Sequence, residues 1–158
     1  MSSSVRSASR KPSTLTRHAA WSLVITLSLA MVYELYRATM KAGVSEHDSM
    51  EVFVLSGLPV YVVAAAVIAA LFAGFRWAVW AGFVMSVALI LVSIFIYNPR
   101  IMLERQPGLI DWVEDLTFTG LLFVAATLLA YELLGGTLEW RATAEHPRVG
   151  NSSGETRA

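Results

Sequence analysis

Acidic side chains in the last third of the chain have the spacing that most strongly suggests chemistry. Asp111, Glu114 and Asp115 stand at positions i, i+3 and i+4, so a helix would place all three on one face of a single turn. Such a face can bind a cation, or concentrate protons and cationic substrates near it. The same acids would also suit the start of a helix, because carboxylates stabilise its free N–H groups. Both interpretations stay open from the sequence.

Ionisable residues also occur inside two apolar runs. Glu34 and Arg37 lie near the end of the first run, and Glu132 lies near the end of the last. An ionisable group at membrane depth is a functional hypothesis by default, although long charged side chains near a helix end can also reach the interface. Because the first and last helices should meet on one side, we expect Arg37 to pair with Glu114 or Asp115.

Other kinds of site are weakly supported. The chain has no cysteine, which excludes thiol chemistry, and its 12 basic and 12 acidic residues cancel. A nucleic-acid-binding protein would usually show a basic excess, so we expect no nucleic-acid partner. Glu46, His47 and Asp48 are predicted to form a solvated loop, since adjacent loop residues rarely converge on one metal ion. We expect no cofactor and no metal.

The elements that must position these residues are long and apolar. Hydrophobic residues make up 56% of the chain and charged residues 15%, against about 25% charged in an ordinary soluble domain. Four apolar runs, 18–38, 50–75, 77–97 and 112–134, are each close to the roughly 20 residues that span a hydrocarbon core. The sequence therefore predicts an all-α integral membrane protein, a four-transmembrane-helix antiparallel bundle over 18–140.

The flanking segments and the basic residues predict an orientation. Residues 1–17 and 141–158 are polar, lack apolar periodicity and are predicted to be disordered tails. With both termini in the cytoplasm, the inner side carries eight basic residues, Arg6, Arg10, Lys11, Arg17, Arg76, Arg141, Arg148 and Arg157. The outer side carries four, Arg37, Lys41, Arg100 and Arg105. This asymmetry favours cytoplasmic termini, in a bacterial inner membrane. A signal peptide cleaved after Ala30 is the competing interpretation.

Small residues recur every four positions along the two middle runs. These stripes are Ala66, Ala70 and Gly74 in the second run and Ala78, Gly82 and Ser86 in the third. Small side chains let helix backbones approach closely in a bilayer, either within one bundle or between copies. Pro59, early in the second run, predicts a kink, because proline frees a carbonyl group of the preceding turn.

The sequence supports three functional interpretations. An accessory or interaction subunit of a membrane assembly is favoured, because the chain has packing faces and little chemistry. The alternative is a small proton- or cation-coupled transporter that acts as an oligomer and uses Glu34 and the acidic turn. A membrane enzyme with an outer carboxylate cluster comes third, and we expect it least. The expected partners are the lipid bilayer and either another membrane protein or further copies of this chain.

Overall fold

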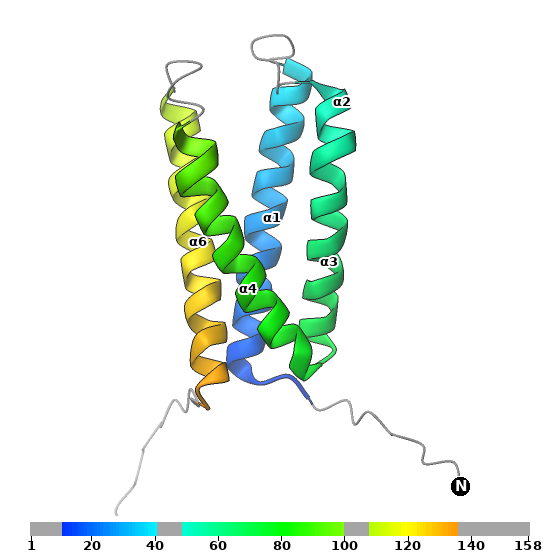
Figure 1. The fold of residues 1–158 in the computed structure, drawn as a ribbon, viewed down its shortest axis with the longest axis vertical. Coiled ribbons are helices and arrows are strands. Elements are labelled where there is room, and N and C mark those ends of the chain that lie inside the picture. The colour runs from blue at the N-terminus through cyan, green and yellow to red at the C-terminus, as the bar shows by residue number, and fades with distance from the viewer. Residues whose placement is uncertain (1–10, 41–48, 100–107, 136–158) are drawn as a thin grey trace, which may run out of the picture.

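Helices dominate the part of the chain that the computed structural model describes, which is residues 11–40, 49–99 and 108–135 (Figure 1). The first rod is α1 (Thr14–Met40). The second runs through α2 (Met50–Val52), the π-helical segment η1 (Phe53–Gly57) and α3 (Leu58–Phe72). The third joins α4 (Arg76–Val92) to the π-helical segment η2 (Ser93–Tyr97), and the fourth is α6 (Leu109–Leu133). By length and composition, all four rods could cross a membrane. Residues 1–10 and 141–158 of the predicted tails and the loop at 46–48 lie outside the described residues. Residues 14–17, predicted to belong to the disordered N-terminal tail, are instead part of α1.

Two helices begin earlier than the apolar pattern predicts, because polar side chains outside the apolar runs cap them. Ser13 Oγ accepts a hydrogen bond of 3.1 Å from the Thr16 N–H, so α1 starts at Thr14 and not at residue 18. Asp111 lies within the first turn of α6, where its Oδ2 accepts the Gly108 N–H at 2.8 Å. That bond extends α6 back to Leu109.

The turn between α3 and α4 corrects the expectation for Gly74. This residue has a φ of 78° and lies beyond the helix, which ends at Phe72. The Phe75 N–H donates to the Ala70 carbonyl and the Gly74 N–H to the Leu71 carbonyl, both at 3.1 Å. This is a glycine-terminated helix end, which a residue with a Cβ would strain. Gly74 therefore forms a turn and is not a helix-packing position.

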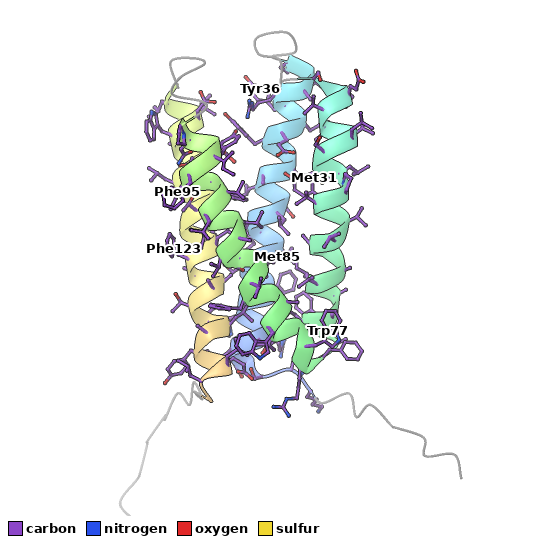
Figure 2. All side chains as sticks on the ribbon, viewed as in Figure 1. Met31, Tyr36, Trp77, Met85, Phe95 and Phe123 are labelled. Carbon is purple, nitrogen blue, oxygen red and sulfur yellow. The ribbon has the colours of Figure 1, made fainter. Side chains whose placement is uncertain are left out.

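The bundle has two distinct ends. In Figure 1, α1 begins and α6 ends at the lower end, which we call the tail end. We call the opposite end, where α1 ends and α6 begins, the polar end. Helix α1 packs most extensively against α6, while α4 crosses from α3 at the tail end to α6 further along (Figure 1). In Figure 2, Trp77 lies near the tail end and Tyr36 near the polar end.

The tail half of the bundle has a close-packed apolar core. Leu23, Leu71, Leu122 and Leu129, from three different rods, are each 0% exposed. Buried hydroxyl groups in this half have hydrogen-bond partners: Ser86 donates to the Gly82 carbonyl at 2.8 Å and Ser22 to the Leu121 carbonyl at 3.1 Å. This core contains no charge among the described buried residues.

The small-residue stripes of the two middle rods have different environments. Ala78, Gly82 and Ser86 on α4 are all buried in the bundle. On α3, Ala70 is buried but Ala66 is exposed, so Ala66 does not contribute to the packing inside this bundle. The buried face of α3 consists of Ala64, Ile68, Ala70 and Leu71, so it combines small and bulky side chains.

Candidate functional site

Polar side chains from all four rods meet at the polar end. Residues near the end of α1 interact with a residue of α3 in the second rod, with a residue of η2 and with residues in the first turns of α6. The first turns of α6 also bond to residues in and just after η2. We call this set the polar cluster; it comprises Tyr33, Glu34, Arg37, Tyr61, Ser93, Tyr97, Asn98, Asp111, Glu114 and Asp115. It includes the five residues that the sequence marked as a candidate charge cluster.

Arg37 is at the centre of the polar cluster. Its side chain is 8% exposed, and its Nη1 donates a hydrogen bond to the Tyr97 hydroxyl. The guanidinium carbon lies 5.8 Å from the ring centroids of both Tyr33 and Tyr97. Planar guanidinium groups are attracted to aromatic faces at this separation. The two tyrosines therefore hold the arginine in a partly aromatic site between α1 and η2.

Asp111 connects α6 to α1. The carboxylate is 8% exposed, and the Tyr33 hydroxyl donates a hydrogen bond to its Oδ1. Its other oxygen caps the helix at Gly108. Since Tyr33 also lies against Arg37, these contacts form a chain of polar groups from the start of α6 to the centre of the cluster. Asp111 is thus a structural connector as well as a cap.

Asp115 connects α6 to η2. Its Oδ1 accepts a hydrogen bond from Ser93 Oγ at 2.8 Å, and its Oδ2 accepts one from Asn98 Nδ2 at 2.9 Å. Ser93 Oγ also lies 3.2 Å from the Thr119 hydroxyl. Hydrogen bonds to a carboxylate are among the stronger ones in proteins. The expected pairing of Arg37 with Asp115 is therefore replaced by contacts from η2.

Glu114, one of the two acids expected to pair with Arg37, interacts with it electrostatically. It also interacts with the carboxylates of Glu34, Asp111 and Asp115. The i, i+3, i+4 spacing thus brings the three acids to one face, as expected, but each has a different neighbourhood. Lys41, Arg100 and Arg105, which could also balance these acids, lie outside the described residues.

Glu34 faces the π-helical segment of the second rod. A Cβ added at Gly57 would lie 3.0 Å from Glu34 Oε2, so the carboxyl rests against the glycine backbone. The Tyr61 hydroxyl interacts with the same carboxyl. Glycine at this position leaves the space that the acid occupies. The segment around Pro59, where a kink was predicted, therefore also borders the polar cluster through Gly57.

Sequence reasoning missed five members of the polar cluster: Tyr33, Tyr61, Ser93, Tyr97 and Asn98. Tyr33, Tyr97 and Asn98 lie near the ends of apolar runs, where such residues are common and carry no charge that would single them out. Tyr61 gave a signal, because it lies deeper in its apolar run than the other tyrosines. Tyr33 gave another, since it stands four residues before Arg37 and a helix stacks such pairs.

The chemical options of the polar cluster are limited by its geometry. Within the described ranges, no three His, Asp or Glu side chains are grouped so that they could hold a metal ion. Comparison of the chain with protein-family models, with curated proteins and with solved structures gives no match. The function of the cluster must therefore be argued from its own contacts.

Proposed function

We propose that the four rods cross a bacterial cell membrane as an antiparallel bundle, with both termini in the cytoplasm. The lengths and compositions of the rods support insertion. The eight basic residues on the tail side against four on the other support this orientation. In this orientation the polar cluster lies between the four rods, close to the outer side of the membrane.

Within that membrane we propose that the chain acts as an accessory or interaction subunit of a larger assembly. The observation that carries this proposal is the confinement of the polar cluster to one end. The opposite half is filled by leucines that are 0% exposed, Leu23, Leu71, Leu122 and Leu129. Because, in the described part of the chain, the charged cluster does not continue through the tail half of the bundle, it offers no polar path for a solute to cross. Contact with a partner at the polar end is the function that this arrangement favours.

Polar groups inside a membrane act as contacts between helices. Half-buried Glu34 is therefore suited to partner binding as well as to contact with η1. A neutral isostere keeps its shape and removes its charge. Half-buried Glu132 at the tail end provides a matched comparison, because it is also a glutamate in an apolar rod.

The test is purification of the tagged full-length chain in mild detergent, with the mass of the complex measured. We expect a second protein in fixed stoichiometry, retained by Glu132→Gln and lost or depleted by Glu34→Gln. A complex that contains only copies of this chain, or one that is indifferent to Glu34, would overturn the subunit proposal.

A proton- or cation-coupled carrier is the second candidate, and one observation favours it. Glu34 on α1 and Glu114 on α6 interact around Arg37, which joins carboxyl groups from two rods at membrane depth. To test this, the protein would be reconstituted into vesicles that enclose a pH-sensitive dye. A carrier would then move protons down an imposed pH gradient, and the dye would report the flux. That flux would fall to the protein-free level in both Glu34→Gln and Glu114→Gln. If vesicles with the unmodified protein show no more proton flux than protein-free vesicles, the protein does not transport protons.

A further inference from the structure

Two π-helical segments occupy equivalent places in the two middle rods. Segment η1 ends at Gly57, two residues before Pro59, and η2 ends at Tyr97, two residues before Pro99. In both, the next residue bonds back over five positions, from Leu58 to Phe53 and from Asn98 to Ser93. A wider turn removes the clash between the proline ring and the preceding carbonyls. Each rod therefore has a locally weakened hydrogen-bond ladder at the polar end.

The two halves of the third rod are attached to the bundle by different forces. In α4, Ala78, Gly82, Ser86 and Ile90 are buried. A Cβ at Gly82 would lie 3.1 Å from both Leu71 and Leu129, which shows how closely this half packs. Close apolar packing of this kind is difficult to loosen without opening a cavity.

Segment η2 has the reverse pattern. Its apolar side chains Ile94, Phe95 and Ile96 are 40%, 70% and 52% exposed, and Phe95 points away from the bundle in Figure 2. The side chains that attach it are polar: Ser93 and the adjoining Asn98 both donate to Asp115, and the Tyr97 hydroxyl accepts from Arg37. Close backbone approaches to α6 are extensive along α4 and few along η2. Hydrogen bonds that hold such a segment can be exchanged for water or other partners.

We infer that η2 is a hinge and that Asp115 is its latch. When the bonds from Ser93 and Asn98 to Asp115 open, the polar end of the third rod swings away from α6 while α4 stays packed. Tyr97 moves with η2, and Tyr97 is the residue that provides one face of the aromatic site around Arg37. Opening the latch therefore uncovers Arg37, whose side chain is 8% exposed in the closed form.

The test uses pairs of nitroxide labels, because a chain without cysteine allows specific attachment. One pair, Phe95→Cys with Val32→Cys, reports on η2 against α1 and uses sites that are 70% and 68% exposed. The other, Trp80→Cys with Ile25→Cys, reports on α4 against α1 at sites 59% and 49% exposed. Distances between labels would be measured by double electron–electron resonance in lipid nanodiscs.

We expect Asp115→Ala to add a longer-distance population to the Phe95–Val32 pair and to leave the Trp80–Ile25 pair unchanged. Asn98→Ala removes one of the two donors and gives a smaller population of the same kind. Adding Pro99→Ala to Asp115→Ala should reduce the new population, since a regular helix can then form. Thr117→Val is the matched control, because that exposed hydroxyl donates to the Val113 carbonyl of its own helix.

Two results would overturn the hinge. One is an unchanged Phe95–Val32 distribution in both Asp115→Ala and Asn98→Ala, which would mean that the contacts do not latch η2. The other is an equal shift in the two label pairs, which would mean that the whole rod loosens. If Asp115→Ala does not purify as a folded protein, Asn98→Ala with the same two label pairs decides the matter alone.

Discussion

Ser13 Oγ donates a hydrogen bond of 2.6 Å to Glu132 Oε2, which ties the start of α1 to the end of α6. The same hydroxyl oxygen accepts the Thr16 N–H as the cap of α1. A carboxylate beside a helix N-terminus is favourable, because it faces the positive end of the helix dipole. Glu132, an ionisable residue inside an apolar run, is thus accounted for as a contact between two helix ends at the tail side.

Removing this contact should destabilise the bundle. We expect Glu132→Gln and Ser13→Ala each to lower the free energy of unfolding by about 1–3 kcal/mol, the range for a hydrogen bond to a charged group. The double variant should be milder than the sum of the two, because both remove one interaction. Thr127→Val, on the exposed side of α6, is the control. Unfolding would be followed by circular dichroism in mixed micelles; strictly additive losses would show that the two residues act separately.

The two helical glycines Gly82 and Gly120 should respond in opposite ways to alanine. At Gly82 a Cβ would lie 3.1 Å from Leu71 and Leu129, while at Gly120 nothing lies within 4 Å. Gly120→Ala should be neutral or stabilising by up to about 1 kcal/mol, through helix propensity. Gly82→Ala should destabilise, and Gly82→Leu more strongly, by about 1–3 kcal/mol or more for overpacking. Thermal unfolding in detergent measures both; a Gly82→Leu variant as stable as the parent would contradict this close packing.

Arg37 should contribute strongly to stability, because its side chain is 8% exposed among carboxyl groups and tyrosines. Arg37→Gln leaves buried carboxylates uncompensated, which costs about 3–5 kcal/mol. Adding Glu114→Gln should restore part of that loss, since it removes one of the uncompensated charges. Arg17→Gln, at an exposed position of α1, is the control and should change stability little in the same unfolding measurement. If the double variant is no more stable than Arg37→Gln, Glu114 is not the acid that Arg37 balances.

Reporter fusions test the proposed orientation. Alkaline phosphatase, which is active only outside the cytoplasm, should be active when fused after Leu103 and inactive when fused after Phe75 or after Gly136. Phe75 lies in the turn between α3 and α4, so a fusion there reports on the tail end of the bundle. The opposite pattern of activity, or a mature chain that begins at Met31, would contradict the orientation.

Much of the fold follows from the sequence. The four apolar runs identify the four rods, because stretches of about 20 mostly apolar residues with few charges have few other stable forms. The ends were less predictable. Ser13 and Asp111 each extend a helix beyond its apolar run through a hydrogen bond to a main-chain N–H. Such caps depend on one side chain and leave no periodic signal.

The candidate site was predictable only in part. The charged members, Glu34, Arg37, Asp111, Glu114 and Asp115, were recognisable because charge inside an apolar run is costly and therefore conspicuous. Their partners were not, since Ser93, Asn98 and Tyr97 are ordinary residues near a helix end. They become significant only when η2 is placed across from α6.

The sequence by itself therefore determined that the chain forms four apolar rods, where their charged residues lie, and which side of a helical turn the acids share. These properties depend on composition and local periodicity. Only the tertiary structure decided that Asp115 holds η2, that Asp111 reaches Tyr33, and that Arg37 lies between two tyrosines. Those contacts join residues far apart in the chain, and they depend on how the helices pack across the bundle, which local periodicity does not specify.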